Sequence, residues 1–283
     1  MLVKREDVAL IVINHLRRLN MKFYLSTFNR ATDGALKKLI SKLKEKDMYT
    51  EYYSEADYII AVADRTETYD FILERFKENM PIIHLWAGEK SCWSTHDDVW
   101  RHSMTLMSEM QLCTNERARE RVEDLCFAVD KRPNAYVVGN VYLDGLETDE
   151  SKVPKYPYNL VLYNPPTRFT KKEVEEELTI VNKKLKELKI DYIWIEPNGD
   201  KFSDIVMQHV THFTFPREEF LGLLKNCEHF ITNSSCQYYE AKYLLKPEQI
   251  ISVGRRNIER ESKYTDMSIP NATNNIIRIL EKL

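Results

Sequence analysis

Short apolar runs alternate with helix-like segments along most of this chain of 283 residues, and this alternation constrains the fold more than any other feature. Short apolar runs bounded by turn residues are typical of buried strands, and longer amphipathic segments are typical of helices. The predicted strands are 22–26, 58–63, 81–86, 110–114, 135–139, 159–163, 192–196, 212–215, 229–232 and 249–253. The predicted helices are 34–46, 67–79, 98–108, 116–128, 171–188, 217–226 and 238–244. Strands that alternate with helices predict an α/β fold, with parallel sheets and helices on both faces.

One segment, 147–158 (ETDESKVPKYPY), interrupts this alternation. It is charged, contains two prolines and has no apolar periodicity, so it is typical of a linker. The prediction is therefore two Rossmann-like parallel-sheet domains, 1–148 and 157–283. Ligands of open α/β sheets bind beyond the carboxyl ends of the strands, so the polar turns after the strands are the places to search for a site.

The composition is that of an ordinary soluble globular protein, with 43% hydrophobic and 30% charged residues. The net charge of −3 gives no global reason to expect nucleic acid. The charge is uneven, because residues 1–47 hold eleven Lys and Arg against five Asp and Glu. Two interpretations of this basic segment remain open: a solvated helix face, or a surface that binds a polyanion.

Five cysteines are scattered through the chain without a CxxC pair. Such a set is typical of a reducing compartment and argues against a disulfide scaffold or a zinc site. No apolar run reaches the length of a membrane span, and residues 1–18 lack the pattern of a signal peptide. We therefore expect a cytoplasmic protein without a metal site or a bound cofactor.

Polar clusters follow two predicted strands of the first half. Asp64-Arg65-Thr66-Glu67 follows strand 58–63, where Asp64 is either a site residue or a helix cap. After strand 81–86 come Glu89 and the stretch 96–102, HDDVWRH. Carboxylates and imidazoles gathered near a strand end are candidates for general acid and base catalysis, although an aspartate here also suits a helix N-terminus. The predicted catalytic residues are Asp64, Glu89, Asp97, Asp98 and Arg101.

Three turns of the second half suit an anion. Asn198, Asp200 and Ser203 lie in a turn after strand 192–196. Asn233-Ser234-Ser235 joins strand 229–232 to a predicted helix, where hydroxyl and N–H groups are able to bind phosphate, or Ser simply caps the helix. Arginines 255, 256 and 260 follow the last predicted strand, either as phosphate-binding guanidinium groups or as a solvated basic turn.

Taken together, these motifs resemble one family. ADR-x-E, H-x-x-x-G-E with DD-x-x-RH, VGN-x-x-LD-x-L, PN-x-D-x-x-S, FLGLLKNC-x-x-x-ITNSS-x-x-x-x-EA and VG-x-R-N-x-x-R-E occur in the order found in the hydrolysing UDP-N-acetylglucosamine 2-epimerases, over residues 22–262. The resemblance implies the GT-B architecture, two Rossmann-like domains facing across a cleft that holds a UDP-sugar.

The resemblance also implies roles for single residues. Ser234 and Ser235 would bind phosphate, Glu240 would accept the ribose hydroxyls, and Arg256 would lie near the uracil or the phosphates. Arg30 matches the arginine of the family's opening turn. The complete set implied for the sugar nucleotide is Arg30, Asn198, Asp200, Ser203, Asn233, Ser234, Ser235, Glu240, Arg256 and Arg260.

The departures from the family fall on the catalytic half. Asn164 stands where the family has a catalytic histidine, and asparagine does not act as a general acid or base near neutral pH. The segment before Asp64 is shorter than in the family, and the helix expected at 6–18 has no counterpart there.

These departures favour a glycosyltransferase with a UDP-sugar donor over an epimerase. The composition is rich in Lys, Tyr and Ile and has only seven Gly, which is typical of a protein from an AT-rich genome. Together with the basic segment, this composition extends the hypothesis to phage DNA modification, with a hydroxymethylated or already glycosylated base as acceptor. A hydrolysing 2-epimerase or hydrolase, and a catalytically inactive sugar-nucleotide-binding module, are the alternatives. The oligomeric state is left open.

Overall fold

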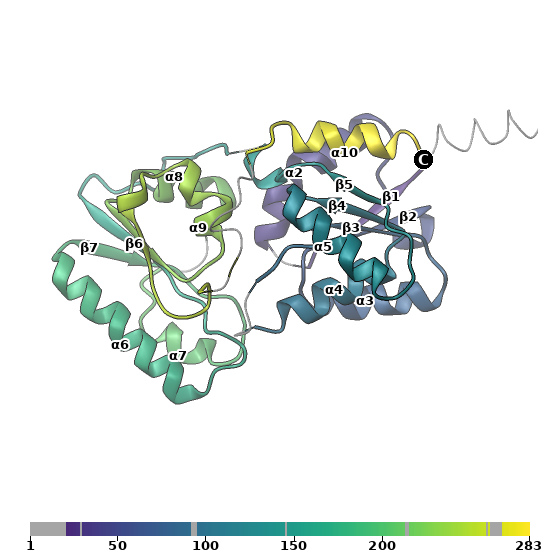
Figure 1. Cartoon of the computed structure of the whole chain (residues 1–283). Helices are drawn as coiled ribbons and strands as arrows, with labels where there is room; N and C mark the ends of the chain where they lie inside the picture. Colours follow the sequence, from purple (N-terminus) through teal and green to yellow (C-terminus); the bar gives the residue numbers. More distant parts are fainter. Residues whose placement is uncertain are drawn as a thin grey trace, which may run out of the picture. The chain divides into compact units, whose positions relative to one another are not determined.

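The computed structural model describes residues 21–28, 30–91, 95–144, 146–212, 215–258, 260 and 268–283, except the side chains of 30–32. The expected helix at 6–18 lies outside these residues. The chain divides into two compact units, and each contains one parallel sheet. The predicted α/β fold with two parallel sheets is confirmed (Figure 1).

The first unit contains a sheet of five parallel strands whose order, β1-β2-β3-β4-β5, follows the sequence. The strands are β1 (Phe23–Ser26), β2 (Tyr58–Val62), β3 (Ile82–Leu85), β4 (Met110–Cys113) and β5 (Ala135–Val137). The helices are α2 (Arg30–Glu45), α3 (Thr66–Lys77), α4 (Asp97–Met107), α5 (Glu116–Phe127) and α10 (Ala272–Leu280), with short 3-10 turns η1 (Tyr53–Glu55) and η2 (Val141–Leu143).

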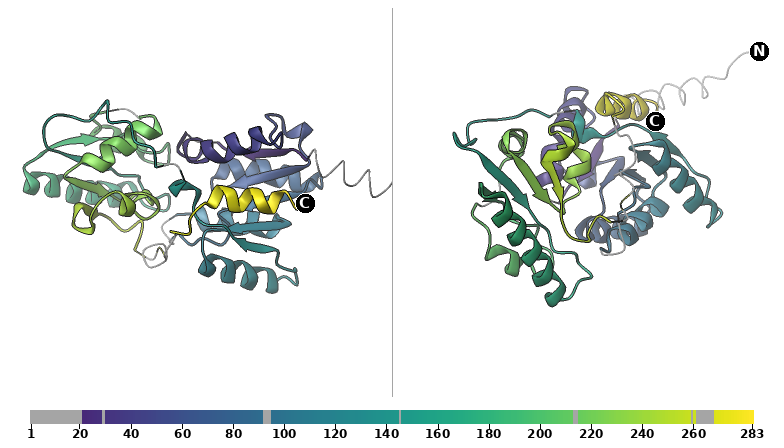
Figure 2. Two further views of the ribbon diagram at one scale, coloured as in Figure 1. Left: turned by 90° about the horizontal axis from the view of Figure 1, so that it is seen from above. Right: turned by 60° about the vertical axis from the view of Figure 1, so that its left-hand side comes forward.

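Helices cover both faces of this first sheet, because its strands are apolar on both sides. Leu36, Leu39 and Leu43 of α2 pack with α10 against one face. Residues of α3, α4 and α5 pack against the other face. Helix α10 comes from the end of the chain and lies beside α2 (Figures 1 and 2).

The second unit contains a sheet of four parallel strands in the order β7-β6-β8-β9. The strands are β6 (Tyr158–Leu162), β7 (Asp191–Trp194), β8 (His229–Thr232) and β9 (Ile250–Ser252). Helices α6 (Lys171–Leu188) and α7 (Ser203–Met207) pack on one face. Helix α8 (Arg217–Asn226) packs on the other, with the short α9 (Cys236–Tyr239) and η3 (Ala241–Tyr243) beyond β8, and η4 (Pro247–Gln249) precedes β9.

The two units of the structure differ in two places from the domains expected at 1–148 and 157–283. Residues 268–283 belong to the first unit, and residues 89–99 belong to the second. The C-terminal segment returns to the first unit because the apolar side of α10, including Ile276 and Ile277, is buried in that unit's core. The composition of 147–158 does not predict that residues 268–283 belong to the first unit, or that residues 89–99 belong to the second.

Part of the segment 147–158 packs closely against α8 in the second unit. The Asp149 N–H donates to the Glu218 carbonyl over 2.8 Å, so the segment runs along the first turns of α8. A Cβ atom at Gly222 would lie 2.0 Å from the Asp149 carbonyl oxygen. A glycine is required at this position because the two backbones approach so closely.

Two predicted elements differ from the structure. In place of a strand at 212–215, His212 forms one isolated parallel bridge with Ile195, and residues 213–214 lie outside the described residues. In place of a helix at 238–244, the chain forms one turn of α-helix in α9 followed by the 3-10 turn η3. Glu240 separates them, with a non-helical backbone conformation of φ −137° and ψ −57°.

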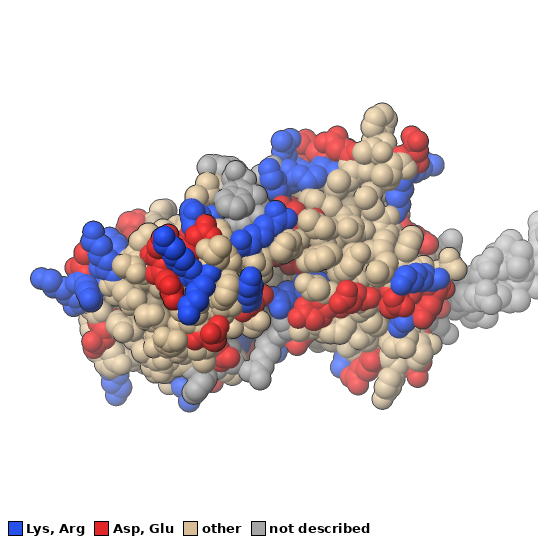
Figure 3. All heavy atoms as spheres, turned by 90° about the horizontal axis from the view of Figure 1, so that it is seen from below, with Lys and Arg blue, Asp and Glu red and all other residues tan. Residues whose placement is uncertain are grey.

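The positive charge of the basic segment near the N-terminus is largely neutralised by ion pairs within its described part, which begins at residue 21. Ion pairs of 2.7 to 3.2 Å join Lys42 to Glu45, Lys44 to Glu51 and Lys46 to Glu281. The Lys38 ammonium group donates to the Asp144 carbonyl over 2.6 Å. These contacts favour the solvated surface over the polyanion site. On the face drawn in Figure 3, Lys and Arg atoms likewise lie beside Asp and Glu atoms.

Among the residues that the structure describes, no helix is both long enough and apolar enough to cross a membrane.

Candidate functional site

The two central strands of the second sheet end where ligands bind in sheets of this kind. Strand β7 lies on one side of β6 and β8 lies on the other, so the direction of strand addition reverses between β6 and β8. In open parallel sheets, ligands bind outside the carboxyl ends of the strands at such a reversal. Asn164 comes just after β6, and Asn233 directly follows β8. The described strands of the first sheet, by contrast, show no reversal.

Asn233 joins the ends of these two central strands through its side-chain amide. Its Oδ1 accepts a hydrogen bond from the Asn164 N–H, and its Nδ2 donates to the Asn164 carbonyl, both over 2.7 Å. Both residues are buried, with exposed fractions of 3% for Asn164 and 0% for Asn233. The amide of Asn233 thus satisfies backbone groups where the ladder of the sheet ends. It supports the turn after β6, and its own amide atoms are already used for that purpose.

Further hydrogen bonds connect the turns after the other two strands. The Asn198 N–H, after β7, donates to Asn164 Oδ1 over 2.8 Å. After β9, Asn257 Nδ2 donates to the Asn233 carbonyl, and Arg260 Nε donates to Asn257 Oδ1 over 2.7 Å. We refer to Asn164, Asn233 and Asn257 as the asparagine network. It links the turns after all four strands of the second sheet.

Arg256 brings a positive charge to this network. Its Nη1 donates to the Asn164 carbonyl over 3.4 Å and lies 4.0 Å from Asp200 Oδ2. A guanidinium group at the carboxyl edge of a parallel sheet suits the oxygens of a phosphate, which it binds with paired N–H groups. The structure therefore brings Arg256, Asp200 and Asn198 together around Asn164, while Ser203 donates its N–H to the Asp200 carbonyl over 3.1 Å.

The serine turn is less helical than its sequence indicates. The Ser234 N–H donates to Thr232 Oγ1 over 2.9 Å, and Ser234 Oγ accepts from the Cys236 N–H over 3.4 Å. Ser235 precedes α9, which has only four residues, and its side chain caps no N–H. A helix this short has a small dipole, so the turn supplies hydroxyl and N–H groups without the field of a long helix. Its predicted phosphate contact stays a prediction.

Glu240 is buried against Arg217, which was not predicted from the sequence as a site residue. An ion pair joins Glu240 Oε1 to Arg217 Nη1 at the start of α8. Burial raises the pKa of Glu240, and the Arg217 charge opposes that shift. A ribose hydroxyl bound at Glu240, as the resemblance implies, would share the carboxylate with Arg217.

A second carboxylate missed from the sequence is Glu177 on α6. Its Oε1 accepts from the Arg255 N–H over 2.8 Å and lies 3.3 Å from Arg255 Nε, and its Oε2 accepts from the Tyr163 hydroxyl over 2.8 Å. Arg255 is therefore held by a buried acid, while its side chain is 42% exposed. The sequence contained an indication that Glu177 is buried, because it lies among Val174, Leu178 and Val181 on the apolar side of its helix.

In the first unit, Asp64 forms an ion pair with Arg101. Asp64 follows β2, and Arg101 lies on α4, where its side chain is 4% exposed. Helix α3 begins after Arg65, and no side chain caps it. The interpretation of Asp64 as a helix cap therefore fails, and the two residues predicted to share a site lie side by side.

Two histidines near this ion pair are neutral at ordinary pH. Burial lowers the pKa of His84 to about 4, against a hydrogen bond with the Ala63 carbonyl that raises it. His84 Nε2 lies 3.0 Å from that carbonyl and Nδ1 lies 2.9 Å from Thr105 Oγ1. Because a carbonyl only accepts, Nε2 carries the proton. For His102, burial first and then the Arg101 and Arg121 charges lower the pKa to about 3.

The other predicted site residues of the first half, Glu89, Asp97, Asp98 and Arg30, lie near α4 or at the start of α2. Glu89 is 5% exposed, and its Oε2 accepts from the Tyr239 hydroxyl over 3.1 Å. Asp98 Oδ1 accepts from the Ser91 N–H over 2.7 Å, which holds the chain before α4. Asp97 is the first residue of α4. The side chain of Arg30 lies outside the described residues.

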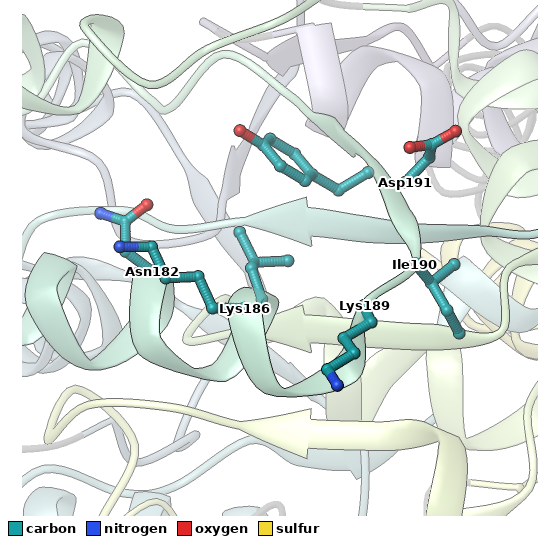
Figure 4. Close-up of a pocket in the computed structure, with 7 residues that line it drawn as sticks. Asn182, Lys186, Lys189, Ile190 and Asp191 are labelled. Carbon is teal, nitrogen blue, oxygen red and sulfur yellow. The ribbon is translucent and has the colours of Figure 1, made fainter.

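A shallow hollow of about 300 Å³ lies elsewhere on the second unit (Figure 4). It is lined by the last turns of α6 and the start of β7, at the amino end of that strand. The lining residues are Asn182, Leu185, Lys186, Lys189, Ile190, Asp191 and Tyr192. None of the predicted site residues is among them, and the carboxyl edge with Asn164 remains the candidate site.

Two Rossmann-like parallel sheets in one chain, the second with polar turns and an arginine at its switch point, define a protein of the GT-B class. Solved structures share this fold. The chain superposes on the UDP-GlcNAc 2-epimerase of Methanocaldococcus jannaschii, solved in complex with UDP-GlcNAc and UDP, with a TM-score of 0.68 at 15% identity, covering 93% of this chain and 100% of that chain. The UDP-GlcNAc 2-epimerase of Neisseria meningitidis bound to UDP-GlcNAc gives a TM-score of 0.66 at 14% identity, covering 93% and 90%.

The UDP-N-acetylglucosamine 2-epimerase family model matches residues 9–283, so the chain belongs to this family. It is 25% identical to the polysialic acid biosynthesis protein P7 of Escherichia coli over 255 residues, and 26% identical to the UDP-N-acetylglucosamine 2-epimerase of Neisseria meningitidis serogroup B over 248 residues. Each match covers 81% of this chain and 63% of the relative, so the chain spans less than two thirds of the length of these relatives.

The preference for a glycosyltransferase acting on phage DNA is wrong. The family match covers almost the whole chain, and the relatives it resembles carry the names of 2-epimerases. The error arose because the altered residues were interpreted as a change of reaction.

Proposed function

We propose that the chain is a UDP-N-acetylhexosamine enzyme of the hydrolysing 2-epimerase type. It breaks the bond between the anomeric carbon and the diphosphate, changes the configuration at C2 and adds water at the anomeric carbon, so that UDP and the free sugar are released. The observation that carries this proposal is the carboxyl edge of the second sheet. There the turns after four strands are linked through the asparagine network, with Arg256 at the switch point. This arrangement suits an anionic nucleotide, and family membership supplies the class of substrate.

The reaction makes two chemical demands on the chain. The departing UDP gains negative charge, which Arg256 at the strand ends is suited to stabilise. Inversion at C2 requires a base that removes the C2 proton and an acid that returns one. Asp64, Glu89, Asp97 and Asp98 are our candidates for these roles. Asn164 is not a candidate, because an amide does not exchange protons near neutral pH.

A second candidate is a sugar-nucleotide-binding module without turnover. Asn164 favours this second candidate, because the resemblance to the family implies a catalytic histidine at this position. In this case the chain would hold a UDP-sugar and leave it intact.

One experiment separates the two candidates. The protein is incubated with UDP-N-acetylglucosamine, and proton NMR follows UDP and the free N-acetylhexosamine, while calorimetry measures UDP binding. Release of UDP together with the C2-epimeric sugar supports the enzyme, and binding without turnover supports the module. Arg256→Gln should lose UDP affinity, whereas Arg278→Gln on the exposed side of α10 should not. A protein that neither binds UDP nor consumes the substrate contradicts both.

A further inference from the structure

Four aromatic rings on the first unit form a cluster beside strand β1. Tyr24 lies in β1, Phe28 just after it, Tyr53 in η1 and Phe71 in α3, and we refer to these four residues as the aromatic cluster. The ring centroid of Phe71 lies 5.6 to 5.7 Å from those of the other three. Phe28 and Tyr53 are 44% and 43% exposed, so the described residues leave part of this apolar surface uncovered. Contiguous exposed apolar surface is a common mark of a binding surface.

The aromatic cluster marks the less covered face of β1. Successive side chains of a strand point to opposite faces of the sheet. Phe23 and Leu25 point to the face that α2 and α10 cover, where they are 0% and 4% exposed. Tyr24 points to the other face, where it packs at the margin of the core formed with α3 and α4 and is only partly buried. On that face, the three-residue turn η1 brings the ring centroid of Tyr53 to 6.3 Å from that of Tyr24.

The route of the chain between β1 and β2 explains this incomplete cover. After α2, the chain first pairs with the outer edge of β1, where the Phe23 N–H donates to the Met48 carbonyl over 2.8 Å and the Thr50 N–H donates to the Phe23 carbonyl over 3.1 Å. Residues 51–57 then complete the connection to β2, and they form only η1. Parallel strands are usually connected through a helix that packs on the sheet. Here α2 packs on one face of β1, and residues 51–57 supply a single turn to the other.

The residues before β1 have the sequence pattern of a helix suited to this cover. Residues 1–20 lie outside the described part of the chain. Within them, Val8, Val12, Leu16 and Leu19 recur at spacings of three and four residues, the period of an apolar helix stripe. As a helix, the segment 8–19 would be about 18 Å long, which is enough to span a strand of four residues, about 13 Å.

The segment 8–19 also ends close to the aromatic cluster along the chain. The Lys22 N–H donates to Asp57 Oδ2 over 2.8 Å, which fixes the start of β1 next to the residues that follow η1. Helix-to-strand connections of a few residues are common in α/β proteins, so a helix that ends near residue 19 would reach the flank of β1 directly. The charges agree with this placement, because Arg17 and Arg18 would approach the exposed Glu55 and Asp57.

We propose that residues 8–19 form an amphipathic helix that packs on the aromatic cluster and covers the open face of β1, with the apolar side formed by Val8, Val12, Leu16 and Leu19. Contact with the cluster would give this helix the stability that a helix of its length lacks alone in water. The proposal concerns an interaction surface of the first unit, so it does not depend on the proposed function.

Hydrogen exchange of the full chain, measured by mass spectrometry, tests this packing with two variants. Leu16→Asp places a charge on the apolar side of the segment. Asn14→Asp is the matched control, because position 14 lies on nearly the opposite side of a helix. In the wild type and in Asn14→Asp, the amides of residues 8–19 should exchange at least about tenfold more slowly than in an unstructured chain. Leu16→Asp should lose this protection.

The turn η1 reports on the aromatic cluster itself. The Glu55 N–H donates to the Tyr52 carbonyl over 3.0 Å, and the Ala56 N–H donates to the Tyr53 carbonyl over 3.2 Å. Both N–H groups should exchange faster in Leu16→Asp than in the wild type. Rapid exchange of residues 8–19 in the wild type would overturn the proposal. Unchanged exchange in η1 after the loss of protection at 8–19 would also overturn it, because the segment would then pack elsewhere.

A substitution in the aromatic cluster keeps the test decisive if Leu16→Asp does not fold. Tyr53→Ser removes a half-exposed ring and should release residues 8–19. Phe127→Ser is its control, since Phe127 is an 85% exposed aromatic residue on α5 of the same unit, and it should leave the protection unchanged. Equal protection of residues 8–19 in the two variants contradicts the proposal.

The oligomeric state distinguishes this packing from contact with a second copy of the chain. Sedimentation velocity should give the same oligomeric state for the wild type and Tyr53→Ser, because the proposed contact lies within one chain. A wild-type dimer that dissociates in Tyr53→Ser would show that a second copy covers the aromatic cluster, and would refute the proposal.

Discussion

Asp64 and Arg101 depend on each other at the scale of single residues. Removing one member of a buried ion pair leaves the other charge in a poorly solvated position. Asp64→Ala should therefore lower the free energy of unfolding by about 3 kcal/mol, measured by urea denaturation. Glu67→Gln removes a member of the more exposed pair between Arg65 and Glu67 and should change stability by less than about 0.5 kcal/mol. Equal effects of the two variants would show that the Asp64 pair is not buried in solution.

His84 makes stability depend on pH through a lowered pKa. Its pKa is about 4 in the folded protein and near 6.5 in the unfolded chain. Between these values the unfolded state binds a proton that the folded state does not, so stability should fall as the pH drops from 6.5 to 4 and level off below. The loss from this group amounts to about 3 kcal/mol. Denaturation of wild type and His84→Asn across this range tests the expectation, and identical pH slopes would refute it.

Among the elements, α10 shows how a helix begins with help from a distant residue. Asn271 precedes α10 with a left-handed φ of 61° and provides no side-chain cap. Instead, the Asp144 carboxylate accepts the N–H groups of Ala272, over 3.1 Å, and of Thr273. The cap residue lies 128 positions away along the chain, so this cap could not be predicted from local sequence. The helix itself was missed although Ile276, Ile277 and Leu280 lie at helical spacing.

Asp144→Ala should lower the stability of the protein by about 1 kcal/mol, as for the loss of an N-terminal cap. Asp144→Asn keeps a side-chain oxygen that accepts an N–H and should recover much of that loss. Thermal unfolding of the two variants provides the measurement. If the alanine and asparagine variants unfold at the same temperature, Asp144 does not act as the cap.

For the whole molecule, UDP binding should stabilise part of one unit. At a hundredfold excess over its dissociation constant, a ligand stabilises its site by about 2.7 kcal/mol. Hydrogen exchange should therefore slow in the turns that contain Asn164, Asn198, Ser234 and Arg256. Residues 189–192, at the start of β7 and the opposite edge of the same sheet, are the internal control and should exchange as before. Protection confined to the first unit would contradict the assignment of the site.

The sequence alone predicted the parts that depend on local patterns. Alternating apolar runs and amphipathic segments identify the two parallel sheets, because each strand and helix must bury an apolar face. Polar and charged residues at strand ends pointed to the turns at Asn198, Asn233 and Arg256, and the order of the motifs identified the family. Asn164 was singled out only through the resemblance to that family. These signals lie within a few residues of each other along the chain.

Only the tertiary structure decided which groups become partners. That Glu240 pairs with Arg217, that Arg255 is held by Glu177, and that Asn233 binds the backbone of Asn164 all follow from strand order and packing. Segments far apart in sequence meet at one edge of a sheet, and burial then forces each polar group to find a nearby partner.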